Sequence, residues 1–599
     1  MVFKKHMNRD NEKQKNGVCN CEKRVTRREA ISTAAKIAAT AVIAGVIAGI
    51  GGYVGGIASA PQREVTREVT KEITKTVTES VGTAPATTVT VTKTQTVTVG
   101  VSVTPTVAKV PGATPEERVL NGLKMLIEEG KIKPGTAITI LTVPGAAAHF
   151  DEKYFREFLD AAQGYVKLNV VTAPPEGIFP KLVSESVEKS GVYDIITVCV
   201  IALISEVVEM GVALELDDYI AKYDPELYTG PCAYPEQVQK SAGVYKGKTY
   251  GFNIDYDVWL THYRADIYED PEIQKEFFDK YGYPLRPPVT WREFRDQAEF
   301  FNRPDEPPHT KLNLSDTPGF YSTWEYKVPY WELYNIGLRW WTTGWPFFDR
   351  EMNPTIEKPE VIKAMKDMLE AHKFQPKESW TSYWDVAYPM FIEGKMAFYI
   401  SWTSLMKSSA TPGSRVRGRV KVAFTPGYPI WGDMDQVGVP RESVRTVGYQ
   451  AASHVMIVNR YSKNPELAYL FAQFFISPGP STRIVEDPAG YFEPFRMCHF
   501  KSKVFEEEWG SEALRVSIDN YDYYAPEIRT PGCPRYQDIL DKEMNAAIQG
   551  RKSLESAIHT IAVEWNKITE EIGRDKLIPL WNEVLDTSIG PKLKPYLKV

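Results

Sequence analysis

The chain has 599 residues, with 71 basic and 77 acidic side chains and a formal net charge of −6 at neutral pH. This near balance predicts no polyanion-binding surface, so nucleic acid is not an expected partner. The sequence also contains no GxxxxGK(S/T), HExxH, CxxC or GxSxG motif. The sequence therefore lacks the best-defined motifs of nucleotide-binding proteins, zinc proteases and serine hydrolases. We expect no cofactor and no metal centre.

The amino-terminal region has the features of a segment directed to a membrane. Residues 37–62 carry no charge over 26 positions, and they follow the pair Arg27 and Arg28 and a basic tail. Because moving Lys and Arg across a bilayer is costly, this pattern predicts a cytoplasmic tail at 1–28 and a signal or transmembrane segment at 29–60. Everything that follows is then expected outside the cytoplasm.

Two interpretations of this segment remain open. Residues 26–31 resemble a twin-arginine export signal and residues 58–60 resemble an A-x-A cleavage site, a combination typical of a cleaved leader. The apolar stretch is also long enough to stay in the bilayer as an anchor. The protein is expected either at the extracellular face of the cytoplasmic membrane, held by this segment, or secreted after cleavage.

Residues 61–113 have a different composition. A quasi-repeat of the type Arg-Glu-Val-Thr begins at Arg63, and Thr and Val then dominate to about Val110. With few large side chains and no aromatic residue in 87–99, this segment cannot offset the ordering entropy of a packed core. We predict an extended stalk between the membrane and a globular domain, with a structured β-repeat as the alternative.

The remaining residues, 114–599, are numerous enough for two large lobes. Strand and helix signals alternate at their start. Strands are predicted at 137–143, 166–172 and 193–201, and helices at 178–189 and on the face formed by Phe150, Tyr154, Phe158 and Ala162. This β-α-β-α-β order indicates an α/β fold with parallel strands, in which ligands lie beyond the carboxyl ends of the strands.

Further helices are predicted from capping and periodicity. Thr290 and Glu293 form a capping box that opens a helix through Phe301. Amphipathic faces with helical spacing occur at 361–372, 467–475 and 554–572. These faces indicate ordinary core packing.

The four cysteines of the expected extracellular part are Cys199, Cys232, Cys498 and Cys533, and they permit three complete pairings. Cys199 lies in an apolar run and is expected to be a buried free thiol. Cys498 and Cys533 both lie in loop-like sequence near Pro and Gly, which makes them the candidate disulfide.

Aromatic residues are concentrated in the middle of the chain. Eight of them fall within residues 324–345, and Trp380, Trp384, Trp402 and Trp431 follow. Many of these must be core residues. Aromatic faces also stack on the C–H face of pyranose rings while nearby carboxylates bind the hydroxyls, so the composition suits a carbohydrate-binding cleft.

Six short segments, in order along about 250 residues, resemble a known family. Residues 245–266 resemble the family pattern G-x-x-Y-G-x-P followed by Y-R/N-x-D, and residues 288–294 resemble P-x-T-W-E-E-F. Residues 391–397 resemble F-x-x-G-K-A-A-M, and residues 426–427 fall where the family has Pro-Gly after a strand. Residues 463–468 resemble K-N-P-E-x-A, and residues 494–496 resemble P-x-R. On these segments the chain resembles the extracellular solute-binding proteins of ATP-binding-cassette (ABC) importers, in their sugar-binding, maltose-type branch.

The resemblance implies a two-lobed periplasmic-binding-protein fold of type II, whose lobes close on a solute. The chain would cross between lobes near Asp255 to Asp257, near 448–451 and near Arg496. The implied first lobe comprises about 137–255 and 451–497, and the implied second lobe about 258–448 and 499–590. A closed receptor of this family would deliver its sugar to the transmembrane permease subunits of the importer.

The resemblance also implies candidate ligand-binding residues. Asp255, Tyr256 and Asp257 lie at the first crossing, where Asp257 takes the place of an acidic sugar ligand. In a strand Asp255 and Asp257 would point to the same side. Trp402 matches a stacking Trp of the family, and Tyr330 and Trp331 fall near another aromatic ligand position.

Departures from the family pattern leave the solute open. Residues 145–148 and 200–202 are apolar or small where maltose-type receptors carry polar ligands, and Asn253 stands where Pro is usual. Polar contacts must then come from other side chains. The further candidates are Glu176, His149, Tyr449, Tyr491 and Arg496.

Two other functions remain as alternatives. A surface-layer or structural protein displayed on the stalk would have no closable cleft. A glycoside hydrolase would need two carboxylates in different environments, but side chains of Asp255 and Asp257 on one strand would lie about 7 Å apart and share one environment. We therefore expect a receptor and no turnover.

Overall fold

The computed structural model describes residues 69–76, 90–97, 110–198, 203–235, 243–449, 453–488, 490 and 492–599. The chain divides into two compact units, residues 1–104 and 105–599, and each is described by itself. The predicted tail and membrane segment lie outside the described residues. Within the described ranges, no helix combines the length and the apolar character needed to cross a bilayer.

The amino-terminal unit contains an antiparallel pair of strands. β1 (Val69–Thr76) and β2 (Thr90–Val97) pair along their whole lengths, with Val69 opposite Val97. Both strands lie inside the predicted stalk, 61–113. Part of that segment therefore has β structure, which is the alternative that its Thr- and Val-rich sequence left open.

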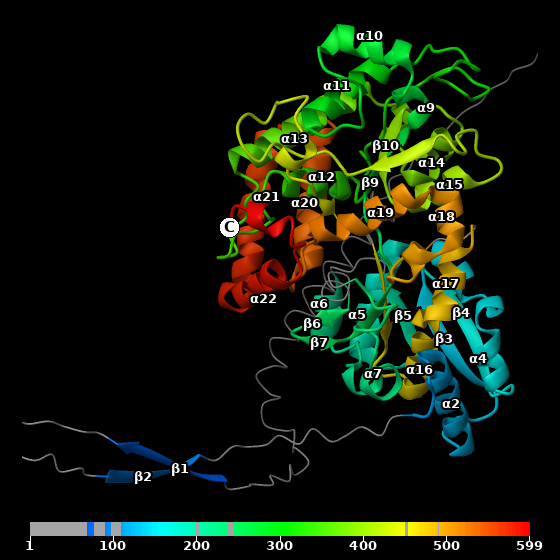
Figure 1. Cartoon of the computed structure of the whole chain (residues 1–599), viewed down its shortest axis with the longest axis vertical. Coiled ribbons are helices and arrows are strands. Elements are labelled where there is room, and N and C mark those ends of the chain that lie inside the picture. The colour runs from blue at the N-terminus through cyan, green and yellow to red at the C-terminus, as the bar shows by residue number, and fades with distance from the viewer. Residues whose placement is uncertain are drawn as a thin grey trace, which may run out of the picture. The chain divides into compact units, whose positions relative to one another are not determined.

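The larger unit contains a five-stranded sheet in the order β4-β3-β5-β13-β8, of which Figure 1 labels β3, β4 and β5. Its strands are β3 (Thr136–Thr142), β4 (Val166–Thr172), β5 (Ile195–Val198), β8 (Gly251–Asp255) and β13 (His454–Val458). β3 is parallel to β4 and β5, whereas β13 is antiparallel to β5 and β8. The predicted order of parallel strands is confirmed.

Helices and a short hairpin complete this first body. They are α2 (Pro115–Glu128), α3 (Pro144–Ala147), α4 (Arg156–Ala161), α5 (Pro175–Glu188), α6 (Ile204–Glu209), α7 (Asp217–Tyr223), α16 (Pro465–Ile476) and α17 (Pro478–Glu486), with β6 (Val244–Tyr245) and β7 (Lys248–Thr249). α16 packs against α2, β13 and β8. α2 thus belongs to this body, although it precedes residue 137, where the first lobe was expected to begin.

The helix predicted from Phe150 to Ala162 is interrupted. Its expected face is buried, but two short 3-10 helices precede α4. Asp151 has an extended backbone, and its carboxylate accepts a hydrogen bond from Lys153 N at 2.8 Å. This local cap ends one turn and begins the next, so the pattern of buried residues remains while the continuous helix does not form.

A second body forms around a three-stranded sheet in the order β10-β9-β11. Its strands are β9 (Leu260–Arg264), β10 (Phe398–Ser401) and β11 (Val420–Ala423), and β9 is antiparallel to both neighbours. Its helices are α9 (Ala265–Tyr268), α10 (Pro271–Tyr281), α11 (Trp291–Phe301), α12 (Glu332–Thr342), α13 (Pro359–Ala371), α14 (Trp384–Ile392), α15 (Ser404–Ala410), α20 (Cys533–Ile548), α21 (Leu554–Ile572) and α22 (Arg574–Thr587). The predicted helices at 361–372, 467–475 and 554–572 correspond to α13, α16 and α21.

Large aromatic side chains fill the core of the second body. Trp340 of α12 stacks on Trp565 of α21 with ring centroids 5.8 Å apart. Trp581 of α22 donates its indole N–H to the carbonyl of Phe348 at 2.9 Å. These rings pack helices from distant parts of the sequence into one core, and much of the aromatic excess is structural.

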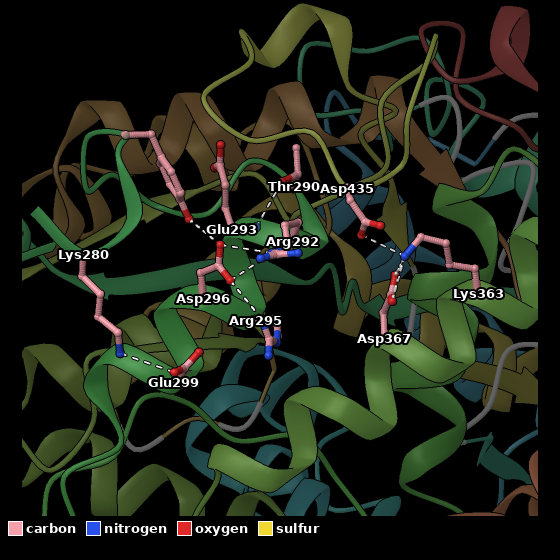
Figure 2. Close-up of polar contacts among 11 residues, drawn as sticks. Lys280, Thr290, Arg292, Glu293, Arg295, Asp296, Glu299, Lys363, Asp367 and Asp435 are labelled. Atoms are coloured by element: carbon pink, nitrogen blue, oxygen red, sulfur yellow. Dashed lines mark hydrogen bonds and ion pairs between the residues drawn. The ribbon is translucent and has the colours of Figure 1, made fainter. Parts of the chain in front are cut away.

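Helix α11 begins with the predicted capping box. Thr290 Oγ1 accepts a hydrogen bond from Glu293 N at 3.1 Å, and Glu293 Oε2 accepts one from Val289 N at 2.8 Å. Figure 2 shows Arg292 paired with Asp296 one turn later, where Arg292 Nε lies 3.0 Å from Asp296 Oδ1. The amino-terminal turn of α11 is therefore held by both backbone caps and an ion pair.

A second set of contacts in Figure 2 ties a loop to α13. Lys363 Nζ lies 3.0 Å from Asp367 Oδ1 within the helix and 2.8 Å from Asp435 Oδ1 in the loop. The hydroxyl of Tyr428 also donates to Asp367 Oδ2 at 2.8 Å. These contacts hold both ends of the loop segment 428–435 against the second body.

The two bodies are connected at several places in the sequence. Residues 256–259 lead from β8 in the first sheet to β9 in the second. β12 (Gly448–Tyr449), which pairs with β14 (Tyr524–Ala525), leads into β13 of the first sheet. α18 (Lys503–Trp509) and α19 (Ser511–Asp519) add buried residues to the first core and also contact α15 and β11 of the second body.

The candidate disulfide Cys498–Cys533 is wrong. Cys498 is bonded to Cys232, with Cα atoms 4.6 Å apart, and Cys533 is a buried free thiol at the start of α20. Met497 N donates to Ala233 O at 2.9 Å, which holds the two bonded segments side by side. Cysteines in loop-like sequence are candidates for a disulfide, but only the tertiary fold decides which loops lie close enough to be bonded. Cys199 lies outside the described residues.

Candidate functional site

Two predicted residues, Asp255 and Asp257, form a buried cluster of carboxylates with Glu493 where the two bodies meet. Asp255 ends β8, Asp257 follows two residues later, and Glu493 lies after α17. One carboxylate oxygen from each lies within 4.8 Å of the others. Glu493 N donates to Asp255 Oδ1 at 2.7 Å, and Asp257 N donates to Ser453 Oγ at 3.0 Å. The two aspartates therefore share one site, as their spacing predicted.

The carboxylates of this cluster are strongly coupled. Burial, followed by the charge of Glu493, raises the pKa of Asp255. Burial also opposes ionisation of Glu493, but hydrogen bonds to Asp255, Asp257 and Ser404 outweigh it and hold the pKa of Glu493 below its usual value. Asp255 is thus the protonated partner and Glu493 the ionised one, so the pair shares a proton.

Lys407 of α15 supplies the nearby positive charge. Its Nζ donates to the carbonyl of Phe492, the residue before Glu493. Burial lowers the pKa of Lys407 to about 8, while the charge of the ionised Glu493 opposes that shift. The spacing of the three carboxylates would also suit a cation. The Lys407 ammonium and the backbone N–H donors already offset much of their charge, so we assign no metal to the cluster.

A hydrogen bond from α15 connects the acidic cluster to the second body. Ser404 is the first residue of α15, and its backbone N donates to Glu493 Oε1 at 2.8 Å. The hydroxyl groups of Tyr388 and Ser404 lie 2.9 Å apart and extend this contact into α14. Because Ser404 follows Trp402 by two residues, the carboxylates are tied to the segment that carries the predicted stacking Trp.

The predicted aromatic residues come together in a second cluster. The Trp402 ring lies edge-on to Trp331, with centroids 6.2 Å apart, and edge-on to Trp259 at 5.6 Å. Trp331 is also edge-on to Tyr330 at 5.6 Å and stacks on Tyr383 at 4.9 Å. Trp402 is buried, whereas Tyr330, Trp331 and Tyr383 are partly exposed. The cluster therefore has a buried base and a partly exposed side.

Aromatic faces beside coupled carboxylates suit recognition of a polyhydroxylated solute. Ring faces accept the C–H side of such a solute, and carboxylate oxygens accept its hydroxyl protons. One carboxylate oxygen from each of Asp255, Asp257 and Glu493 lies within 4.8 Å of the other two. The groups are too close together to flank a glycosidic bond as separate acid and base, so the cluster is suited to binding and not to cleavage.

Two candidates from the crossings are packed into cores. The ring of Tyr256 lies 4.3 Å from that of Tyr521, and its side chain is buried in the first core. Tyr449 is buried against α12, where a Cβ added to Gly337 would lie 2.2 Å from the Tyr449 hydroxyl oxygen. Both rings therefore support the connections between the bodies in this conformation.

Arg496 and His149 hold backbone segments. Arg496 is buried and donates to the carbonyls of Cys232 and Ile476. His149 stacks on Phe492 with centroids 4.3 Å apart, and its Nε2 accepts a hydrogen bond from Phe492 N at 3.2 Å. His149 thus fixes the residue next to Glu493, and Arg496 fixes the segment beyond it.

The last two candidates are not brought into either cluster by a described contact. Glu176 is exposed in the first turn of α5. Tyr491 lies outside the described residues.

Sequence reasoning missed Glu493, Ser404 and Lys407. Glu493 directly precedes the P-x-R segment at 494–496, so its place next to a predicted crossing was the available signal. Ser404 and Lys407 follow Trp402 closely, but nothing in their spacing indicates that α15 points at a carboxylate from a segment about ninety residues later. Only the folded chain makes that contact.

Two α/β bodies, joined by chain crossings and meeting at a cluster of acids and aromatic rings, define the class of two-lobed binding proteins. Residues 147–481 match the family of bacterial extracellular solute-binding proteins. This match covers more than half of the chain, and the protein belongs to that family. Its members are binding proteins, so the protein is a solute receptor of an extracellular class and not an enzyme.

Solved structures with the same fold agree with this assignment. A ribitol complex of an ABC transporter solute-binding protein from Agrobacterium radiobacter is similar with a TM-score of 0.58 and 20% identity, over 73% of this chain and 99% of that one. A maltose-bound protein from T. maritima has a TM-score of 0.57 and 17% identity, over 72% and 100%. A solute-binding protein from Thermotoga lettingae bound to α-D-tagatose has a TM-score of 0.55 and 18% identity, over 72% of this chain and 100% of that one. At these identities the likeness concerns the fold.

Proposed function

We propose that this protein is the extracellular receptor of an ABC importer and that it binds a sugar, a sugar alcohol or an oligosaccharide. The observation that carries the proposal is the link between Trp402 and Glu493. Ser404 joins an aromatic cluster in the second body to a carboxylate cluster at the end of the first sheet. The ligands of the similar solved structures, ribitol, maltose and tagatose, are small and rich in hydroxyl groups. This chemistry favours the receptor over a surface-layer protein or a hydrolase.

The solute would bind where the two bodies face each other. In this proposal Asp257 and Glu493 accept hydroxyl protons, while Tyr330, Trp331 and Trp402 provide ring faces. The lobes correspond to about 137–255 with 451–497 and about 258–448 with 499–590, with α2 added to the first. Solute contacts to both lobes stabilise the closed form, which then docks on the transmembrane permease subunits.

The amino-terminal residues would place the receptor at the membrane. In this proposal residues 1–28 stay in the cytoplasm, residues 29–60 act as signal or anchor, and residues 61–113 form the tether. The acidic and basic totals are close, so adsorption on a charged surface is not the expected means of attachment. Amino-terminal sequencing of the protein from its native membrane distinguishes cleavage near residue 60 from retention.

The experiment uses purified residues 105–599, which form one compact unit. Ribitol, D-tagatose, maltose and longer oligosaccharides are titrated while tryptophan fluorescence and melting temperature are followed. Saturable binding without release of product supports the receptor. Release of product would support a hydrolase, and no response to any of these solutes would contradict a sugar receptor.

Trp402→Ala tests the aromatic part of the site. We expect binding to weaken by about 1–2 kcal/mol, roughly 5- to 30-fold, because a stacking ring is lost. Trp431→Ala is the matched control, since Trp431 is 76% exposed and makes no contact with the cluster among the ring contacts described. Wild-type affinity in a folded Trp402→Ala variant would remove Trp402 from the site.

A further inference from the structure

Tyr330 has an unusual backbone conformation for a large side chain. Its φ angle is +76°, in the left-handed region that favours glycine, and it is one of six non-glycine residues with positive φ in the described part of the chain. A bulky residue in this region is strained, and such strain persists only where surrounding contacts hold it. Tyr330 is also a predicted ligand-binding residue, so what holds its turn bears on recognition.

The contact that holds this turn comes from a helix far along the sequence. Asp541 of α20 accepts a hydrogen bond from Tyr330 N at 2.6 Å. Asn545, one turn further along α20, donates its side-chain amide to the carbonyl of Lys327 at 3.2 Å. α12, which begins just after the turn, packs against α20, and Figure 1 shows the two helices next to each other. Helix α20 therefore holds residues 327–330 at both ends.

Glu332, which follows Tyr330 by two residues, also interacts with Asp541. It is the first residue of α12, and its side chain is fully buried. Burial and then the charge of Asp541 raise the pKa of Glu332 to about 10. At neutral pH Glu332 is thus a carboxylic acid, and its proton can be donated to the Asp541 carboxylate. Asp541 thus accepts a hydrogen bond from the backbone of Tyr330 and lies close enough to Glu332 for its charge to raise the pKa of that buried side chain.

The conformation of this turn determines where the Tyr330 ring lies in the aromatic cluster. The hydroxyl of Tyr334 donates to that of Tyr330 at 3.0 Å, and the Tyr330 ring stands at 90° to the ring of Trp331. Trp331 in turn contacts Trp402. A different φ at Tyr330 would rotate its ring relative to Trp331 and change the partly exposed side of the cluster.

We propose that Asp541 is a positioning residue for solute recognition, because its carboxylate holds Tyr330 in the left-handed conformation that presents the ring beside Trp331, which in turn contacts Trp402. The role rests on the proposed function, since it assumes that these rings contact the solute. Asp541 itself need not touch the solute. Nothing in its sequence surroundings indicates this role, because the chain separation of the two residues is 211 positions.

The test compares variants of α20 in residues 105–599. Asp541→Ala removes the acceptor, Asp541→Asn keeps one side-chain oxygen that can accept from Tyr330 N, and Asp538→Ala is the control. Asp538 is exposed on the same helix. With ribitol, D-tagatose and maltose as probes, we expect Asp541→Ala to bind roughly ten-fold more weakly, a change typical of lost pre-organisation. Asp541→Asn should recover most of the affinity, and Asp538→Ala should match the wild type.

A second background separates positioning from general stability. If Asp541 acts through Tyr330, then Asp541→Ala should cause no further loss of affinity in a Tyr330→Ala variant. Amide hydrogen exchange at Tyr330 should also be faster in Asp541→Ala and unchanged in Asp538→Ala. A general loss of stability would instead add to the effect of Tyr330→Ala.

The outcomes distinguish this inference from the proposed function. If the wild type binds and Asp541→Ala binds equally tightly, the positioning role is overturned while the receptor proposal stands. The same holds if the loss of affinity in Asp541→Ala adds fully to the loss in Tyr330→Ala. If the wild type binds none of the three probes, the sugar-receptor proposal fails, and the role of Asp541 in recognition fails with it.

Discussion

At the scale of single residues, burial decides what charge a side chain carries. Asp255 and Glu493 lie in contact, and their surroundings shift their pKa values in opposite directions. Lys407 is the nearby cation, with its own pKa lowered by burial to about 8. The sequence shows acids and a lysine, but the protonation state of each follows from which of them are buried together.

Glu332 provides a test of this effect through pH dependence. Because its folded-state pKa is raised to about 10 from an ordinary value of 4.5, the folded state holds a proton that the unfolded state releases between these values. Its contribution is fully present below about pH 4.5 and is lost as pH rises towards 10, with a slope of up to ~1.4 kcal/mol per pH unit. Glu332→Gln keeps an uncharged hydrogen-bonding side chain of the same size and should therefore be more stable than the wild type at pH 8.

The measurement is chemical denaturation of residues 105–599 at pH 5, 7 and 9. The advantage of Glu332→Gln over the wild type should grow with pH. Glu442→Gln, at an exposed position with no side-chain ion pair in the described part of the chain, is the control and should show no such trend. A constant difference between Glu332→Gln and wild type across this range would show that Glu332 is ionised in the folded protein.

At the scale of helices and strands, local sequence signals predict most boundaries well. The Thr290 capping box, the parallel strand order and the long apolar face of α21 are all present in the structure. Each depends on contacts within one element or between sequence neighbours. The interrupted helix before α4 shows the limit of this reasoning, because the Asp151 cap competes with helix continuation although the periodic pattern is helical.

Thr290→Ala tests the cap of α11. We expect a loss of about 1 kcal/mol in unfolding free energy, because Glu293 N loses its acceptor in a fully buried turn. Thr290→Ser keeps the hydroxyl and should retain most of the stability. Denaturant midpoints at equal m-values provide the comparison. Equal losses in the Ala and Ser variants would indicate that the methyl group, and not the cap, stabilises this turn.

At the scale of the whole molecule, one covalent link closes a very long loop. Cys232 and Cys498 are 266 residues apart in sequence, and their bond joins the first body to the segment that carries Glu493 and Arg496. Cross-links over long loops reduce the entropy of the unfolded chain, although the mechanism depends on the thermodynamic treatment used. The bond also holds the carbonyl of Cys232 where Arg496 donates to it.

Cys232→Ser should lower the stability of the folded protein by about 2–5 kcal/mol under oxidising conditions. Cys533→Ala is the control for cysteine loss, since Cys533 is a free thiol. Peptide mapping without reduction should recover residues 232 and 498 in one linked product. A linked product containing residue 533 would show that the pairing in solution differs from the structure.

The sequence by itself determined the class of this protein. Ordered motifs and alternating strands and helices are local or linear features, and they were enough to indicate a two-lobed extracellular solute receptor, for which Asp255, Asp257, Tyr330, Trp331 and Trp402 stay predicted ligand-binding residues. Only the tertiary structure decided that Glu493 and Lys407 join the aspartates, that Tyr449 and Arg496 are packed into cores, and that Cys498 bonds to Cys232. The physical reason is that these contacts join residues far apart in the chain, and their energies depend on burial and mutual distance, which no local pattern encodes.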